Sequence, residues 1–598
     1  LEKSIKSKKR FSLSTPNRLI IVFEGLDKQI KTLSEKIKGP KTNASEQALE
    51  GFLRSKKIEK KDLFKNQTEK GEFYFYKTKS KLLKTHDLLI EIIPKLLENY
   101  QWKKSMKWGE FDLNWGRPLK SILSVFDKKV INFRFHHIFS SNSTYIDKDF
   151  EEKKKNFSDF KSYEKYFKKQ GTLINQDKRK ELINTGFLKV LNKRKLSIND
   201  NPKLLDEVVN LVDSPNILLC SFDKKFLTIP REILILTMET HQKYFPTFDN
   251  KGEITNEFLI VTNKKDQKGL IRIGNERVVE ARLSDAEFFW NKDKTKNLVK
   301  KVSDLKSISF FKELGTYFDK IQRMRKLGGM ISDELLISKE KVELSASICK
   351  TDLTSDLVGE FPELQGIMGG HFATHQGFDK DISLAITEQY LPIGLNSKIP
   401  KKLFSVALSI TDKIDTLVGF FGINEKPTSS KDPFALRRIA LGIIRTIIEN
   451  KKNFKINDLL NYSAGLYQDQ GIIFTNQDLF KDLNNFLKDR FRYYLKEKKI
   501  RFDIADATIS SFSLNKIYSS FDKAYRLNQI IDNQTGIDII SSYKRASNIL
   551  ESELKNSEIE ITNTTDPGIF KSDYEKNLYK KINEIKKYYS GINNDENY

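Results

Sequence analysis

Basic and aromatic side chains alternate over residues 488–501, where the sequence reads KDRFRYYLKEKKIR. Lys and Arg side chains neutralise phosphates, and an exposed aromatic ring can stack on an unpaired base. The pattern therefore predicts a contact with single-stranded RNA. An amphipathic helix with core aromatics and solvated cations fits the same periodicity equally well. The candidate contact residues are Lys488, Arg490, Arg492, Tyr493, Lys496 and Arg501, followed by Lys544 and Arg545.

Two histidines four residues apart, His371 and His375, are the strongest candidates for metal ligands. On a helix, this spacing places both imidazole rings on one face. Glycines crowd the same segment and weaken a helix there, among them Gly369 and Gly370. Polar residues at a helix end or at an interface are the favoured interpretation, and the sequence predicts no metal ligands. The dipeptide His86-Asp87 occurs without the further His and Asp residues that a metal-dependent phosphohydrolase needs.

A nucleotide-binding phosphate loop is missing from the sequence. Gly269 and Gly274 have the required separation, but Asn275 and Glu276 follow where Lys and a hydroxyl-bearing residue are needed. No Gly-x-Ser-x-Gly motif marks a serine nucleophile either. The sequence therefore predicts no catalytic residue and no cofactor bound by this chain.

Composition supports a polyanionic partner. The chain has 598 residues and a formal net charge of +25, which favours nucleic acid because each neutralised phosphate releases counterions. A coding bias that spreads Lys over ordinary surface is the alternative. Only two cysteines occur, so no disulfide framework is expected. No apolar run reaches the roughly 20 residues that span a bilayer, and we expect a cytoplasmic protein without membrane contact.

The elements that must position these residues change in type along the chain. Short strands are predicted at residues 17–26, 216–220, 226–229 and 258–262, with a hairpin over 122–137 and helices at 82–97 and 150–170. After residue 300 the pattern is helical, with helices at 401–420, 433–450, 478–499 and 543–555. Apolar residues at three- and four-residue spacing predict one buried face for the helix over 401–420. The expected fold class is an α+β N-terminal half followed by an all-α C-terminal half.

Several long segments resemble the β subunit of bacterial two-subunit glycyl-tRNA synthetases, in the order of that family. They read TPNRLIIVFEGL at residues 15–26, MKWG at 106–109, IPREILILTMETHQKYFPTFD at 229–249, GNERVVEARLSDAEFFW at 274–290, KTDLTSDLVGEFPELQGIMGG at 350–370, TDKIDTL at 411–417, KDPFALRR at 431–438 and YKRASNIL at 543–550. The resemblance covers nearly the whole chain.

This resemblance implies an assembly of two α and two β chains. ATP, with Mg²⁺, and glycine would be used at a site on the α chain, while the β chain would bind and orient tRNA(Gly). It also implies an N-terminal α+β body over residues 1–300, a helical domain similar to His-Asp phosphohydrolases over 301–455, and a helical anticodon-binding domain over 456–598. The 488–501 segment would then face the tRNA.

The sequence departs from the phosphohydrolase pattern at the expected metal site. Lys350, Thr351 and Asp352 stand where the His-Asp pair would lie, so the domain is expected to be degenerate. Asp412 remains as a lone carboxylate that we expect to point away from the apolar stripe into solvent. Gln376 replaces an Asp that the family commonly has after the second histidine. Both ends also look shorter than in the family, and we expect a fragment.

Two other functions stay open at this point. The middle domain could act as an independent phosphohydrolase, which predicts bound divalent metal and phosphodiester turnover. The chain could also be a general RNA-binding protein, which predicts no complex with an α chain and no preference for tRNA(Gly).

Overall fold

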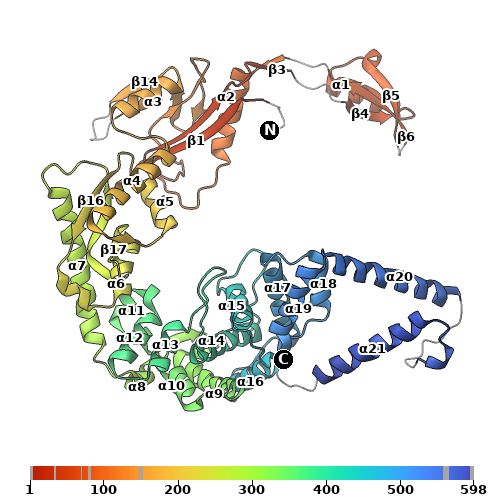
Figure 1. Ribbon diagram of the computed structural model, residues 1–598. Coiled ribbons are helices and arrows are strands. Elements are labelled where there is room, and N and C mark those ends of the chain that lie inside the picture. Colours follow the sequence, from red (N-terminus) through yellow and green to blue (C-terminus); the bar gives the residue numbers. More distant parts are fainter. Residues whose placement is uncertain are drawn as a thin grey trace. The chain divides into compact units, whose positions relative to one another are not determined.

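The computed structural model describes residues 5–31, 36–68, 71–78, 82–146, 153–556 and 565–592 (Figure 1). The chain divides into two compact units, Leu1–Leu283 and Ser284–Tyr598, called unit 1 and unit 2 below. The division falls within helix α7, Leu270–Asp293. The finer division into three domains stays a prediction.

Unit 1 begins with small antiparallel sheets. Strands β1, Lys9–Thr15, and β2, Arg18–Glu24, form a hairpin where the sequence predicts a strand. Strands β3, Gln29–Lys31, and β7, Leu82–Lys84, pair with each other. Between them in sequence lie β4, Lys36–Lys41, α1, Glu46–Lys56, β5, Leu63–Thr68, and β6, Gly71–Lys77, with the sheet order β4-β6-β5.

The predicted hairpin over residues 122–137 is confirmed. Strands β9, Val125–Phe126, and β10, Lys129–Val130, pair across a two-residue turn. Asp127 and Lys128 both have positive φ, of 48° and 64°, which is the geometry that twists a tight turn correctly between two strands. The other short strands here are β8, Ile122–Leu123, β11, Arg134–Phe135, β12, Ile138–Ser141, and β13, Ser143–Tyr145.

Two predicted helices are shorter than expected. Helix α2, Thr85–Glu98, begins three residues late, because Leu82–Lys84 forms strand β7 against β3. Helix α3, Phe160–Lys169, begins at the Asp159 cap, and Lys154–Asn156 forms strand β14. Residues 150–152 lie outside the described residues. In both cases a neighbouring strand supplies backbone partners that periodicity within one segment does not reveal.

A four-stranded antiparallel sheet forms the second part of unit 1. Its order is β15-β17-β18-β16, with bounds Ser197–Ile198, Phe245–Phe248, Ile254–Thr262 and Asn216–Ser221. Helices α4, Gln176–Arg194, and α5, Pro202–Leu211, pack on it through one apolar cluster. The strand predicted over 226–229 is wrong: Lys224–Thr228 is a 3-10 turn, and helix α6, Arg231–Leu236, begins after two further residues.

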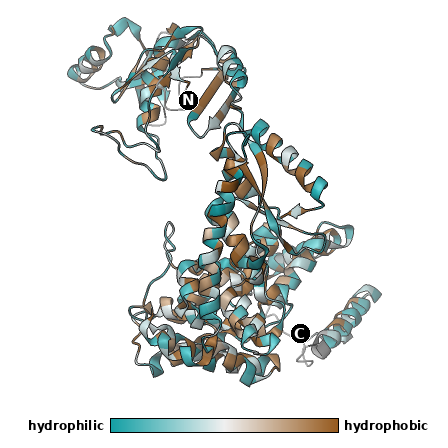
Figure 2. Ribbon diagram, turned by 90° about the vertical axis from the view of Figure 1, so that its left-hand side faces the viewer, coloured by the Kyte–Doolittle hydropathy of each residue, from teal (hydrophilic) through white to brown (hydrophobic). Residues whose placement is uncertain are grey.

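In the described residues of unit 2, the only strands are the short pair β19, Ser309–Phe311, and β20, Gly315–Thr316, and the other elements are helices. Single helices of this unit carry both hydrophilic and hydrophobic residues (Figure 2). Their bounds are α8 Leu298–Lys301, α9 Tyr317–Leu335, α10 Lys339–Ile348, α11 Asp356–Glu360, α12 Ile367–His375, α13 Lys380–Glu388, α14 Leu403–Gly422, α15 Leu436–Glu449, α16 Ile456–Asp469, α17 Leu479–Glu497, α18 Phe502–Ser510, α19 Ile517–Ile530, α20 Gln534–Asn556 and α21 Asp573–Ile592.

Helix α14 lies at the centre of the unit-2 core. The sequence predicts one buried face for it, but every residue from 405 to 422 is buried. The reason is that α9, α10, α13, α15, α16 and α17 all pack around it. One hydrophobic cluster includes residues between Leu314 and Ile531, so α9, α10 and α14 to α19 share a single core.

The expected fold class is confirmed in outline: strands mix with helices in the N-terminal part, and the C-terminal half is mostly helical. Likeness of unit 2 to a phosphohydrolase domain and to an anticodon-binding domain stays a prediction. Among the described residues, no helix is long and apolar enough to cross a membrane.

Candidate nucleic-acid interface and a buried ion-pair network

Helix α17 carries most of the candidate RNA-contact residues. Leu483, Leu487 and Phe491 recur at four-residue spacing and are fully buried, which fixes one face of the helix in the core. Lys488, Arg492 and Lys496 also recur at four-residue spacing, and this places them together on another face. Arg492 and Lys496 are exposed and Lys488 is half-buried. These three residues are called the α17 stripe below.

The aromatic residues of this segment divide between core and surface. Phe491 and Tyr494 are 0% and 1% exposed, and each packs against a ring from a later segment, Phe512 and Phe521 respectively. Tyr493 is 39% exposed. Of the three rings, only Tyr493 is therefore accessible to an unpaired base. The core interpretation is right for two of the three aromatics.

Carboxylates surround the stripe loosely. The guanidinium of Arg492 lies 3.8 Å from Asp489 and 3.9 Å from Asp506, at the limit of ion pairing and in solvent. Exposed pairs of this kind contribute little, typically under about 1 kcal/mol, so a phosphate can replace them. Arg490 is half-buried, and its guanidinium lies 5.8 Å and 5.9 Å from the rings of Phe486 and Tyr493.

Arg501 is held more firmly than the other candidates. Its guanidinium lies 2.6 Å from Asp503 and 2.5 Å from Asp532, and its backbone N–H donates to Asn528. The hydrogen bond between Arg501 and Asp503 raises the pKa of Arg501 above its usual value and lowers the pKa of Asp503 to about 2. Arg501 thus lies at the corner between α17 and α18, and its hydrogen-bond donors already have partners within the protein.

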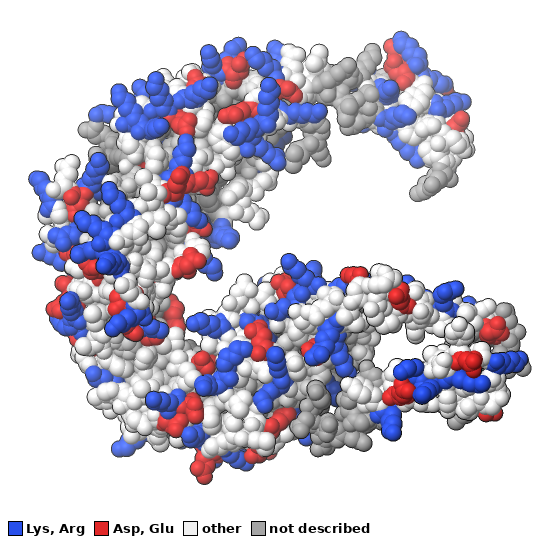
Figure 3. Space-filling view, viewed as in Figure 1, with Lys and Arg blue, Asp and Glu red and all other residues white. Residues whose placement is uncertain are grey.

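Lys544 and Arg545 lie on α20, and both are exposed. Tyr543 beside them is 72% exposed. On the face shown in Figure 3, Lys and Arg side chains are spread over both units. Charge alone therefore does not single out one surface; what distinguishes the α17 stripe is regular spacing beside an accessible ring.

A network of buried charges lies elsewhere in unit 2. Lys350 Nζ lies 3.0 Å and Lys320 Nζ 3.2 Å from Asp412 Oδ1, and all three side chains are buried. The expectation that Asp412 points into solvent is therefore wrong. Because helices pack around α14, the side chain of Asp412 is largely shielded from water and is stabilised by two ammonium groups instead.

The same network continues to Asp415. This fully buried carboxylate accepts hydrogen bonds from Arg323 at 2.8 Å and from Lys320 at 3.0 Å, and the Tyr467 hydroxyl donates to it at 3.2 Å. Lys320 thus bridges Asp412 and Asp415, which lie one turn apart on α14. The guanidinium of Arg323 also lies 3.8 Å from the Tyr467 ring.

Burial and neighbouring charges shift the pKa values in this network. Although desolvation alone would raise it, the nearby Lys320 and Lys350 ammonium groups hold the pKa of Asp412 well below its usual range. Lys413 donates to the carbonyl of Leu391 at 2.7 Å, and burial lowers its pKa to about 7. Burial raises the pKa of Asp352 to about 6.

The three residues at the expected His-Asp position have structural roles. Lys350 lies against Asp412 and 4.0 Å from the Tyr390 ring, and Thr351 donates to Ile348 O. Asp352 accepts the backbone N–H groups of Gly366 and Gly369, so it anchors the start of α12. Asp412 is thus paired with ammonium groups, and one oxygen of Asp352 accepts backbone donors.

His371 and His375 do lie on one helix, α12, despite the glycines. The structure explains the glycines, because a Cβ on Gly369 or Gly370 would collide with Ile386 or Thr387 of α13. Both imidazole rings lie at 6.3 Å from Trp290, and Gln376 accepts the Leu298 N–H, which closes the end of α12. Among the described residues, no cluster of His, Cys, Asp and Glu side chains is suited to a metal ion.

The roles of Lys320, Arg323 and Asp415 were not predicted from the sequence. A signal was present, since TDKID interrupts the apolar run of residues 403–421 with three charges in four positions. Charges inside an otherwise apolar helix need partners from another element. Periodicity within α14 does not reveal that those partners come from α9.

Comparisons with known proteins give the same family along most of the chain. A family model described as glycyl-tRNA synthetase beta subunit matches residues 1–510. The chain is 36% identical over 573 residues to the glycine–tRNA ligase beta subunit of Rickettsia canadensis, covering 95% of this chain and 83% of that protein. It is 34% identical over 586 residues to the corresponding protein of Rickettsia felis, covering 98% and 85%.

These alignments lend no support to the expectation of a fragment. The matched residues include the β1–β2 hairpin, the four-stranded sheet, the buried network and the α17 stripe. The chain therefore belongs to the family of glycyl-tRNA synthetase beta subunits, which are subunits of glycine–tRNA ligase.

Proposed function

We propose that this chain binds tRNA(Gly) and orients it for ATP-dependent glycylation at the active site of an α subunit. Membership of the family makes it a ligase subunit, and the name beta subunit of its relatives implies an α partner. In this proposal two α and two β chains assemble in the cytoplasm. ATP, with Mg²⁺, and glycine bind the α chain, and this chain provides no catalytic residue.

The α17 stripe is the observation that carries the tRNA contact. Lys488, Arg492 and Lys496 present three positive charges along one helix face, and Tyr493 offers a ring next to them. Phosphates bind the cations, and an unpaired base stacks on the ring. The buried faces of α17 pack in the unit-2 core, which holds the stripe rigidly and reduces the entropy lost on binding. Lys544 and Arg545 of α20 are the next contacts.

Orientation of the tRNA is a sufficient contribution to catalysis. Holding two reactants in a productive geometry can lower the barrier by several kcal/mol, up to about 10. A subunit without its own active site can therefore control the rate of the reaction. The buried network at Asp412, in this view, stabilises unit 2 and takes no part in the chemistry.

Charging assays test this proposal directly. Glycylation of tRNA(Gly) is measured with the α chain alone, with the full β chain added, and with a K488Q/R492Q/K496Q variant. We expect no charging without the β chain and a higher KM for tRNA in the variant. The matched control is K326Q/K339Q/K398Q, which removes three exposed charges elsewhere in unit 2. Equal charging with and without the β chain contradicts the proposal.

A further inference from the structure

Residues 36–78 form a small module of their own within unit 1. It contains the sheet β4-β6-β5 and helix α1, and β3 pairs with β7 at the two points where the chain enters and leaves it. β6 is the central strand and β4 is an edge strand, hydrogen-bonded on one side only within the sheet.

Positive charge gathers on the strands of this module. The described residues of the module include ten Lys and Arg against five Asp and Glu. The acidic residues are concentrated around α1, whereas the three strands carry only one, Glu72. The strands have five lysines: Lys36, Lys38, Lys41, Lys65 and Lys77.

The strand register brings like charges and aromatic rings together. Lys36 lies directly opposite Lys77, a cross-strand pair that is destabilising by itself. Lys38 Nζ lies 3.5 Å and Lys41 Nζ 5.8 Å from the ring centroid of Phe73. These contacts hold both ammonium groups over the ring, and a ring contact leaves the charge of an ammonium group in place.

Within the described part of the chain, no carboxylate pairs with these lysines. Among the described residues, none lies within ion-pair distance of Lys36, Lys38 or Lys41, and all three lysines are exposed. A polyanion would relieve the Lys36–Lys77 repulsion and gain three cations at one strand. Lysines also discourage pairing of an edge with another protein strand, so a polyanion is favoured over a peptide.

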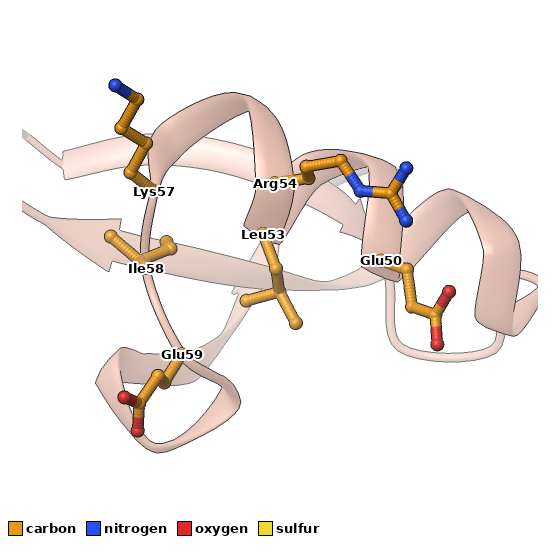
Figure 4. Close-up of a pocket in the computed structure, with 6 residues that line it drawn as sticks. All are labelled: Glu50, Leu53, Arg54, Lys57, Ile58 and Glu59. Atoms are coloured by element: carbon orange, nitrogen blue, oxygen red, sulfur yellow. The ribbon is translucent and has the colours of Figure 1, made fainter.

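The helix side of the module differs in charge. The shallow hollow beside the end of α1 is lined by both signs, with Glu50 and Glu59 near Arg54 and Lys57 (Figure 4). A mixed surface has no net attraction for phosphate. The sheet edge and the helix side of one module thus provide a test surface and a control surface.

We propose that Lys36, Lys38 and Lys41, called the β4 edge, bind the phosphate backbone of the tRNA at a second contact separate from the α17 stripe. The proposal rests on the proposed function, since it takes tRNA as the ligand. The lysines bind phosphates, and Phe73 keeps two of them positioned. The contact is to the backbone and is therefore independent of base sequence.

The test measures binding of a tRNA(Gly) transcript by the full chain at several salt concentrations. A K36Q/K38Q/K41Q variant is compared with K56Q/K60Q/K61Q, which removes the same charge from the helix side of the same module. Each lost phosphate contact lowers the slope of log affinity against log salt by about 1. We expect a slope lower by two to three units for the β4-edge variant and a much smaller change for the control.

Hydroxyl-radical footprinting of the bound transcript provides the second readout. The β4-edge variant should lose protection at a short run of riboses while the rest of the footprint stays, and a K36R/K38R/K41R variant should keep it. Equal effects of the two Gln variants, or unchanged slope and footprint, overturn the proposal. If the β4-edge variant binds like the wild type while K488Q/R492Q/K496Q binds more weakly, the β4-edge proposal fails and the proposed function stands. If wild-type chain binds no tRNA, the proposed function fails.

Discussion

Lys350 Nζ lies 3.0 Å from Asp412 Oδ1, and both residues are buried. The two residues belong to segments that are far apart in sequence, the 3-10 turn after α10 and the middle of α14. Two ammonium groups and one carboxylate meet at this point, because Lys320 also contacts Asp412. Such a site is stable only when each charge keeps its partner.

Removing one partner should therefore destabilise unit 2. Lys350→Met keeps most of the side-chain volume but leaves Asp412 with Lys320 alone, and we expect a loss of about 3 kcal/mol in the free energy of unfolding. Urea unfolding of the full chain, followed by circular dichroism, measures it. The double variant K350M/D412L should lose less than the sum of the two single variants, because it leaves no unpaired charge. Additive losses would show that the pair has no coupling.

The pH dependence of stability should report Lys413. Burial lowers the pKa of Lys413 to about 7 in the folded protein, against 10.5 for an unperturbed lysine. Between these two values the unfolded chain binds more protons than the folded one, so stability rises as pH rises from about 7 to about 10. The groups that face its ammonium are the carbonyls of Gln389, Leu391 and Ser409 and the Ser409 hydroxyl.

Comparison with a Lys413→Met variant isolates this contribution. Other groups titrate in the same range, so the quantity of interest is the difference in unfolding free energy between the two proteins at each pH. We expect the wild type to gain on the variant by up to about 1.4 kcal/mol per pH unit above pH 7. A constant difference between pH 7 and pH 10 would mean that Lys413 keeps its ordinary pKa.

Close packing of α12 on α13 leads to a further prediction. A Cβ on Gly370 would overlap Thr387 and approach the carbonyl of Ser383, so Gly370→Ala must push the helices apart and should cost about 1–3 kcal/mol. Gly359→Ala is the control: Gly359 lies in helix α11 with nothing near its Cβ position. Thermal unfolding measures both variants. A Gly370→Ala protein as stable as the control would disprove the close contact.

Local patterns predicted four helices of unit 2, namely α14, α15, α17 and part of α20, but not what surrounds them. Periodicity located α14 and α17 within a few residues, because 3.6-residue spacing is a property of one segment. The surroundings of Asp412 depended on Lys320 and Lys350, 92 and 62 positions away, and a single-segment pattern carries no such information. The same reason explains the strand wrongly predicted at 226–229, where a short apolar run fits a strand or a turn equally.

The candidate interface was predictable in composition and only partly in geometry. The alternation of basic and aromatic residues indicated α17 as an RNA contact, a function that remains a proposal. Which rings are accessible depends on the packing of Phe512 and Phe521 against α17, from segments that follow it. Phe491 follows the apolar residue Leu487 by four positions. This helical spacing was the signal in the sequence that the Phe491 ring is part of the core.

Adjacent tyrosines on α17 should therefore behave differently. Tyr493 is 39% exposed beside the stripe, and Tyr494 is 1% exposed in the core. Tyr493→Ala should weaken binding of tRNA(Gly) by roughly tenfold, the loss of one base stacked on one ring, with little change in stability. Tyr494→Ala should instead cost about 3–5 kcal/mol of stability. Filter binding and urea unfolding of both variants separate the two effects. Tyr493→Phe, which keeps the ring, should bind like the wild type; equal binding by Tyr493→Ala would rule out stacking at this position.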